Sequence, residues 1–119
     1  MREILFRGKT VKTNEWVYGS LIAGKTCSTI CNEHGKVLVK SGTVGQYTGL
    51  TDRNGKKIFE GDCVKDLFRF GLTIDCTVAF KDGGFGVVDY LGNFQAFTSF
   101  WNVEWEITGN IHEELAYGT

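Results

Sequence analysis

Residues 43–65 read TVGQYTGLTDRNGKKIFEGDCVK, and this stretch decides which fold we expect. The segment contains four glycines and two turn signals. Asp52-Arg53-Asn54-Gly55 is typical of a tight turn, with glycine where a positive φ is needed. Glu60-Gly61-Asp62 indicates a second bend, which leads into an expected strand from Cys63 to Phe70. We therefore expect short strands that are separated by tight turns.

The residues before this stretch predict an N-terminal β hairpin. Residues 4–9 and 15–22 are expected strands, joined by the polar residues 10–14. Trp16 and Tyr18 fall on one face of the second strand and Val17 falls on the other, as a period of two requires. Residues 24–35 are polar and rich in turn formers, so we expect a loop there, followed by a short apolar run at 37–39.

The residues after this stretch predict a meander of antiparallel strands. Ile74, Cys76, Val78 and Phe80 alternate with polar residues, and residues 82–84 indicate a hairpin turn into a strand at 85–90. Another turn is expected at 91–93, and Val103, Trp105 and Ile107 share one face of a final strand. Residues 94–102 fit a short helix or a 3-10 segment, and residues 110–119 are expected to form a tail.

Composition supports one small, mainly β domain. The chain has 119 residues, 16 of them glycine and none proline, and 13% are aromatic. Such a composition favours a small barrel or sandwich and excludes a coiled coil, a collagen-like chain and a repeat array. The N-terminal apolar run is broken by Arg7 and is not a secretory signal, and no run is long enough to cross a membrane. We expect a cytoplasmic protein.

Charge is unevenly distributed along the chain, although the net charge is only -1. Residues 1–57 contain ten Lys or Arg and four Asp or Glu, whereas residues 58–119 contain three and ten. The two halves neutralise each other within one fold, associate head to tail between subunits, or present a basic binding face. We favour these interpretations in that order.

Three segments of the chain resemble the YopX-like family of phages and prophages. They are VGQYTGLTDRNGKKIFEGDCVK in the middle, FRGKTVKTNEWVYGSLI near the start and EITGNIHE near the end. Because the three matches occur in the family's order, the resemblance covers nearly the whole chain. The middle motif is the most specific, and Cys63 departs from it where family members usually carry an aliphatic residue.

The resemblance implies a single domain over residues 1–119. It would consist of a β subregion at about residues 1–42, then the signature segment and an SH3-like barrel at about 43–110, then a tail. The signature residues would be structural; they are Gly45, Tyr47, Gly49, Asp52, Gly55, Glu60, Gly61 and Asp62. The family's members are phage accessory proteins, and the resemblance transfers no catalytic residue, no metal ligand and no cofactor.

The candidate sites for metal binding or catalysis are weak. Cys27, Cys31 and His34 have zinc-like spacing, but a second pair of ligands would have to come from Cys63, Cys76 or His112. We prefer a polar loop with small residues. Asp52, Glu60 and Asp62 could hold a divalent ion in a hydrolytic enzyme, but turn chemistry explains them better. Neither histidine belongs to a known nucleophile motif.

A nucleic-acid site is the main alternative to a protein-binding role. Arg53, Lys56 and Lys57 are close to Tyr47 in sequence, and small barrels use such groups to bind single strands. The wider set of candidate stacking aromatics is Trp16, Tyr18, Phe68, Phe70, Trp101 and Trp105. The near-zero net charge argues against strong phosphate binding, and a small domain needs large side chains for its core.

We therefore expect a non-enzymatic module that binds proteins or assembles with itself. Its partner would be a second copy of the chain or another phage or host protein. The aromatic residues at 68–72 are a candidate subunit contact, and sheet edges favour pairing between chains. A nucleic-acid-binding accessory factor of phage replication or regulation is the alternative.

Overall fold

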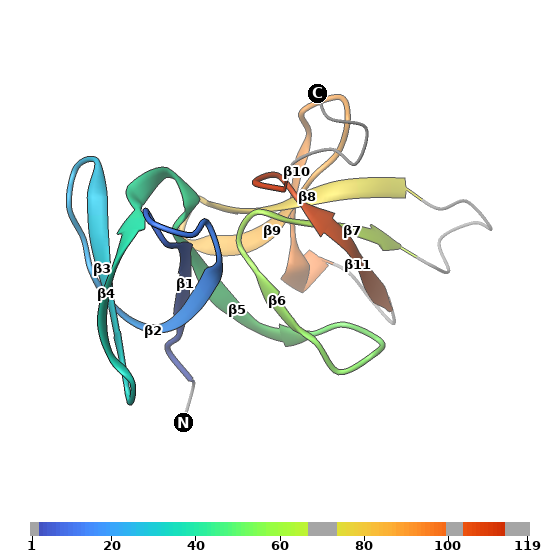
Figure 1. Cartoon of the computed structure of the whole chain (residues 1–119). Helices are drawn as coiled ribbons and strands as arrows, with labels where there is room; N and C mark the ends of the chain where they lie inside the picture. The colour runs from blue at the N-terminus through green and yellow to red at the C-terminus, as the bar shows by residue number, and fades with distance from the viewer. Residues whose placement is uncertain (1–2, 67–73, 100–103, 114–119) are drawn as a thin grey trace. The chain divides into compact units, whose positions relative to one another are not determined.

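The fold is built from short antiparallel strands, as the sequence predicts. A computed structural model describes residues 3–66, 74–99 and 104–113 (Figure 1). The strands are β1 (Phe6–Lys9), β2 (Trp16–Ile22), β3 (Cys27–Asn32), β4 (Gly35–Lys40), β5 (Gly45–Thr51), β6 (Lys57–Phe59), β7 (Asp62–Asp66), β8 (Ile74–Lys81), β9 (Gly84–Val88), β10 (Phe94–Ala96) and β11 (Trp105–Asn110). Two 3-10 turns accompany them, η1 (Ser41–Thr43) and η3 (Phe97–Ser99).

The chain divides into two compact units, residues 1–49 and 50–119. The first sheet has the strand order β4-β3-β2-β1-β5-β6, in which β5 runs past the unit boundary. The second sheet, with the order β10-β9-β8-β7-β11, belongs to unit 2. The boundary falls seven residues beyond the subregion limit that the sequence suggested near residue 42. The assignment of residues 1–119 to a single domain stays a prediction.

Unit 1 begins with the predicted hairpin of β1 and β2. Lys9 pairs with Trp16 and Arg7 with Tyr18, so these four side chains share one face. The sheet then curls until β4 returns to the chain just after β1, where Thr10 and Val39 form a bridge. Gly8 permits this approach, because a Cβ there would lie 2.8 Å from Val39 Cγ2.

The expected loop at residues 24–35 is wrong, because its centre is strand β3. Ser28 and Ile30 point into unit 1 and are buried, whereas Cys27, Thr29 and Cys31 alternate with them on the outer face. Thr, Ile and Cys side chains fit a pleated strand even when the segment is short of apolar residues. The β3–β4 turn is closed by the Asn32 side chain, whose Oδ1 accepts from the His34 backbone N–H.

Unit 2 contains the predicted meander. Strands β7, β8, β9 and β10 pair in succession, and β11 returns to pair with β7. The described strands form two open antiparallel sheets, so the expected closed barrel is not present among them. Strand β10 has only three residues and runs into η3. In the strand order, β10 and β11 lie at opposite edges of the sheet.

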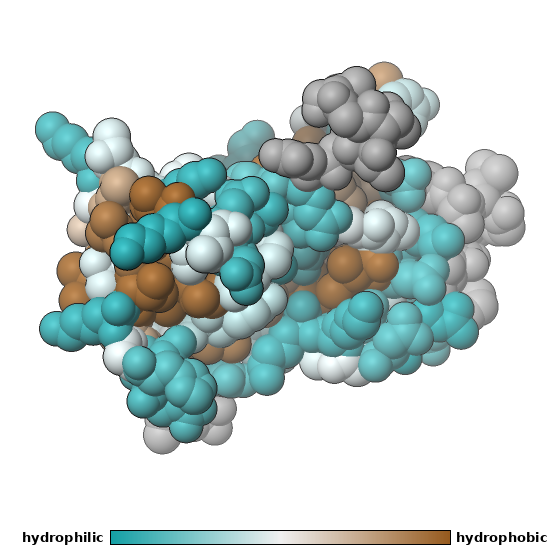
Figure 2. Space-filling view, viewed as in Figure 1, coloured by the Kyte–Doolittle hydropathy of each residue, from teal (hydrophilic) through white to brown (hydrophobic). Residues whose placement is uncertain are grey.

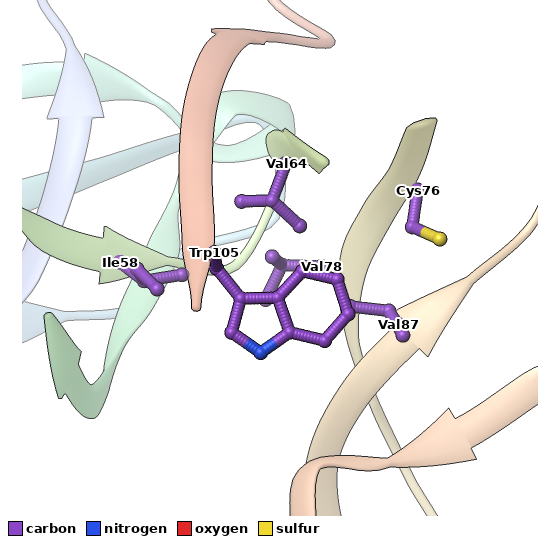
Figure 3. Packing of buried hydrophobic residues seen from close by; sticks show 6 residues of the cluster. All are labelled: Ile58, Val64, Cys76, Val78, Val87 and Trp105. Atoms are coloured by element: carbon purple, nitrogen blue, oxygen red, sulfur yellow. The ribbon is translucent and has the colours of Figure 1, made fainter. Parts of the chain in front are cut away.

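The core of unit 2 lies on one face of this sheet. Its buried cluster consists of Ile58, Val64, Cys76, Val78, Val87 and Trp105, with Phe97 and Ile107 packed against it. Figure 3 shows these buried side chains gathered around the Trp105 indole, which also meets Phe97 edge to face at 5.8 Å. The shared faces predicted for Cys76 with Val78 and for Trp105 with Ile107 are confirmed and point into the core, whereas Phe80 at the end of β8 is 53% exposed.

The ambiguous segment at residues 94–102 begins as strand β10 and continues as the 3-10 turn η3. The 3-10 interpretation is therefore confirmed for residues 97–99, and η1 is a second such turn that the sequence reading did not include. Predictions about Phe68, Phe70, Trp101 and the contact at 68–72 lie outside the described residues. In the part of the chain that is described, no helix has the length and apolar character to cross a membrane.

Candidate functional site

The turn between β5 and β6 is organised by a single carboxylate. Asp52 Oδ1 accepts from the backbone N–H of Asn54 at 2.8 Å and of Lys56 at 3.0 Å. The other oxygen, Oδ2, accepts from the Ile107 N–H of β11 at 3.1 Å. The predicted turn role of Asp52 is confirmed, and the same side chain also ties this turn to a strand 55 residues away.

The environment of Asp52 keeps its carboxylate ionised. Burial on its own raises the pKa of this group, but the hydrogen bonds from Ile107, Lys56 and Asn54 together outweigh burial. The nearby Lys56 charge acts in the same direction as these bonds, so the pKa falls below its ordinary value of 3.8. The carboxylate is therefore a fixed acceptor at neutral pH.

The same turn covers the outer edge of β11. The Arg53 N–H donates to the Trp105 carbonyl oxygen at 2.9 Å, next to the bond between Ile107 and Asp52. Both β11 groups point away from β7, on the side of the strand that has no neighbour in the sheet order. An open strand edge invites pairing with other chains, and this turn occupies it.

The second bend of the signature segment is also structural. Asp62 is buried, and its Oδ2 accepts from the Phe59 N–H at 2.8 Å, as the turn interpretation predicts. Gly61 adopts a φ of 91°, donates to the Val78 carbonyl oxygen and accepts from the Ile111 N–H. Glu60 is half-buried beside them. Within the described residues, no three metal-ligating side chains gather closely enough to hold an ion.

The remaining signature residues lie along the first sheet and its last turn. Gly45 is buried opposite Arg7, and Tyr47 is 8% exposed, with its N–H bonded to the Leu5 carbonyl oxygen. Gly49 ends unit 1, and Gly55 has the positive φ of 80° that the sequence predicts for the turn. The structural role that the resemblance implies for these positions stays a prediction.

The candidate nucleic-acid residues are placed in different environments. Arg53 and Lys56 are exposed on the Asp52 turn of unit 2, and Lys57 is exposed at the start of β6. Tyr47 belongs to unit 1, and its burial leaves little ring surface for a base to stack on. The nucleic-acid contact itself stays a prediction.

Two of the other candidate stacking aromatics, Trp16 and Trp105, also contact other residues of the protein. Trp105 is buried in the core of unit 2. The ring of Trp16 carries the Arg7 guanidinium at 4.2 Å and the Lys9 ammonium at 5.3 Å from its centroid. Tyr18 is exposed on β2. A continuous aromatic platform is therefore not formed by the described residues of the predicted set.

The candidate zinc residues lie on the β3–β4 hairpin. Cys27 is exposed and Cys31 half-buried on β3, while His34 is exposed in the turn, 3.8 Å from the Glu33 carboxylate. Cys63 and Cys76 lie on β7 and β8 of the other unit, and all four cysteines are free. The loop interpretation that we preferred for this segment is replaced by a hairpin.

A cleft of about 190 Å³ opens on the outer face of the second sheet. Its lining consists of Cys63, Asp75, Cys76, Thr77, Val88, Asp89 and Tyr90. Burial raises the pKa of the Cys63 thiol, and the Asp62 and Asp75 charges add to this effect against a hydrogen bond with Thr77. The thiol is thereby kept protonated, which does not favour a nucleophilic role.

A rigid turn beside this cleft presents two large side chains to solvent. Tyr90 is 85% exposed and Leu91 is 69% exposed, between β9 and β10. Asp89 Oδ1 accepts from the N–H groups of Leu91 and Asn93, and these bonds hold the pKa of the carboxyl below its ordinary value. The turn at 91–93 is predicted by its sequence, whereas the exposure of Tyr90 and Leu91 is not.

Unit 1 presents an apolar row on its outer face. Ile22, Thr29 and Leu38 lie directly opposite one another across β2, β3 and β4. Ile22 is 56% exposed and Leu38 is 50% exposed. Figure 2 shows hydrophobic side chains at the surface over this part of the molecule, beside hydrophilic side chains that project outward. The signal in the sequence was the run Val37-Leu38-Val39, which a two-sided strand cannot bury completely.

These features define an all-β protein with two open sheets, a structural signature segment and exposed apolar groups on both units. The model of the YopX protein family matches residues 5–115. The chain therefore belongs to the YopX protein family, as the three sequence segments predict. No curated protein matches the chain.

Proposed function

We propose that this protein is a non-enzymatic interaction module whose copies associate with one another. The observation that carries this proposal is the opposite charge of its two compact units. Residues 1–49 contain seven Lys or Arg and three Asp or Glu, whereas residues 50–119 contain six and eleven. Units of opposite net charge attract and orient two copies, and exposed apolar side chains then stabilise the contact.

The mode of association follows from this charge difference. A contact between like units would bring surfaces of the same sign together, whereas a contact between unlike units pairs opposite signs. We therefore propose that unit 1 of one copy meets unit 2 of another. Such a contact is heterologous, and it repeats until a ring closes or a filament grows.

Light scattering after size exclusion tests the proposal directly. We expect the mass at low salt to exceed the chain mass of 13.3 kDa and to rise with protein concentration. A mass of 13.3 kDa at every concentration would contradict self-association. The partner would then be sought among other phage or host proteins.

An SH3-like architecture for unit 2 belongs to the same proposal. Its support is the order of the elements. Strands β7 to β10 pair in sequence, the 3-10 turn η3 follows, and β11 pairs with β7. Small folds of this class serve many different binding functions. The proposed setting is the cytoplasm of a host that carries the phage or prophage, in which the four free cysteines would stay reduced.

A nucleic-acid-binding accessory factor is the second candidate. It is favoured by three exposed cations, of which those at positions 53 and 56 lie on a turn that Asp52 holds in place and the third, at position 57, begins β6. The test is fluorescence anisotropy with labelled single-stranded DNA, duplex DNA and RNA. We expect Lys56→Glu with Lys57→Glu to weaken binding and flatten its salt dependence. Lys12→Glu with Lys25→Glu, at exposed positions of unit 1, is the matched control.

Two results would remove the nucleic-acid candidate. One is the absence of saturable binding by the wild-type protein at low salt, where even non-specific complexes form. The other is equal weakening by the 56/57 pair and by the 12/25 pair, since this would place the effect on net charge and not on the turn.

A further inference from the structure

The turn between β9 and β10 has the properties of a docking anchor. We name Tyr90 and Leu91 the tip. The turn below the tip is held by the Asp89 carboxylate, which accepts from the N–H groups of Leu91 at 2.9 Å and Asn93 at 3.0 Å. Two backbone bonds, Asp89 N–H to the Asn93 oxygen and Gly92 N–H to the Asp89 oxygen, close the same loop. Because these bonds fix the backbone of the turn, docking would cost little further backbone entropy.

The tip is also unusual in composition for a position so exposed. Turn centres are normally occupied by small or polar residues, whereas here an aromatic and an aliphatic side chain are the two most exposed large hydrophobic residues of the described chain. Aromatic side chains that project from a rigid element are frequent anchors of protein interfaces. The tip therefore needs an apolar surface on a partner against which its two side chains can pack.

The described residues offer such a surface on unit 1. We name Ile22, Thr29 and Leu38 the row. These residues lie directly opposite one another on three paired strands, so the sheet holds the row in place. The opposite face of the same strands carries the fully buried Ile30 and Val39, which fix the orientation of the row.

Charges flank the two surfaces with opposite signs. Lys36 and Lys40 lie two residues before and after Leu38 on β4, so they share its face of the sheet. Lys40 Nζ also donates to Asn14 Oδ1 at 3.0 Å. On the other unit, Asp75 and Asp89 line the cleft together with Tyr90. The row is thus bordered by cations and the tip by carboxylates.

We propose that the tip of one copy docks on the row of a second copy. The apolar groups would provide the contact area, and the lysines beside Leu38 would approach the carboxylates beside Tyr90. This inference rests on the proposed self-association and adds the two surfaces through which it occurs. Each copy carries one tip and one row. After two copies have paired, one tip and one row of the pair stay unoccupied, so further copies can bind.

The test uses two variants that each lack one surface. The row variant carries Lys36→Glu and Leu38→Glu, and the tip variant carries Tyr90→Ser and Leu91→Ser. We expect each variant alone to have its association constant lowered about tenfold or more, as loss of a central anchor does. Mixed in equal amounts, the two variants should form a pair that stops at twice 13.3 kDa, because only one tip and one row remain.

The matched control carries Ile4→Ser and Ile111→Ser. These residues are 65% and 58% exposed and lie outside both surfaces, so the control should assemble as the wild-type protein does. Circular dichroism and urea unfolding of every variant show whether it remains folded. Should the row variant fail to fold, Lys36→Glu alone replaces it, and Asp75→Lys in the same chain should restore assembly through the exchanged charges.

Failure of the proposed self-association and failure of the docking of the tip on the row give different results. If the wild-type protein stays at 13.3 kDa, the proposed self-association is wrong and this inference is wrong with it. If the wild-type protein assembles but the mixed variants do not pair, or the control loses assembly as strongly as the variants do, self-association stands and the docking of the tip on the row is wrong.

Discussion

Asp52 accepts three backbone hydrogen bonds, and a neutral amide in its place accepts fewer. Its two oxygens receive the N–H groups of Asn54, Lys56 and Ile107. In asparagine one of these oxygens is an NH₂ group, which is a donor only. One of these three N–H groups, in the turn or on β11, would then lose its acceptor. Because Asp52 is buried, leaving that donor unsatisfied is costly.

We predict that Asp52→Asn lowers the free energy of unfolding by about 1–3 kcal/mol, the usual cost of leaving such a donor unsatisfied. Urea unfolding at neutral pH measures the change. Asp82→Asn is the control, because Asp82 is exposed and its φ of 54° is one that asparagine tolerates. Equal effects of the two substitutions would show that the Asp52 bonds do not stabilise the fold.

The stabilisation by Asp52 should disappear in acid. Folding lowers the pKa of this carboxyl, so its contribution is complete above the ordinary value of 3.8 and is lost as the pH falls through the lower pKa of the folded state. We therefore expect the stability difference between the wild-type protein and Asp52→Asn to be constant near neutral pH and to narrow below 3.8. Chemical denaturation at a series of pH values measures it.

The effect of Asp89 cancels in this comparison, because its lowered pKa is common to both proteins. A difference in unfolding free energy that stayed unchanged through the acid range would show that the charge of Asp52 is not what stabilises the turn.

Strands β9 and β10 approach each other closely at Gly86. A Cβ at this position would collide with the Gln95 carbonyl oxygen and lie 2.7 Å from Phe94 Cζ. We predict that Gly86→Ala destabilises the protein by about 1–3 kcal/mol, since backbone must move to accommodate the methyl group. Thermal and urea unfolding report the change.

Gly84, two residues earlier on the same strand, is a matched control. A Cβ there meets nothing within 4 Å, so Gly84→Ala should leave stability nearly unchanged. Equal losses from the two substitutions would assign the effect to strand glycines in general and not to the contact between β9 and β10.

The elements that could be predicted from the sequence are those with strong local signals. Alternation identified β2 and β8, and glycine turns identified the hairpins after Asp52 and Lys81. Strand β3 was missed because its inward residues are Ser28 and Ile30, so only one of them carries an apolar signal. The strand order of the second sheet depends on which distant strands pair, and no local pattern specifies that.

The features of the candidate site also divide into those that local sequence predicts and those that depend on tertiary packing. The turn roles of Asp52 and Asp62 could be predicted, because side-chain bonds to nearby backbone are local. The bond from Ile107 to Asp52, the buried state of Tyr47 and the exposure of Tyr90, Leu91 and Leu38 depend on tertiary packing. Sequence patterns describe which residues are apolar but not which of them the fold leaves outside.

For the whole molecule, salt should control assembly. Attraction between units of opposite net charge is screened as ionic strength rises, whereas contact between apolar surfaces is not. We predict that the mass measured by light scattering falls toward 13.3 kDa between low and high sodium chloride. A mass above 13.3 kDa that did not change with salt would show that charge is not what brings the copies together.

The turn that covers β11 has a consequence for solubility. Six strand residues, Trp105–Asn110, would offer an open edge to any extended chain if the Asp52 turn moved away. Protein that is still folded could then pair edge to edge without limit and precipitate. Loss of the Asp52 carboxylate would in that case cause turbidity during purification in addition to the lower free energy of unfolding.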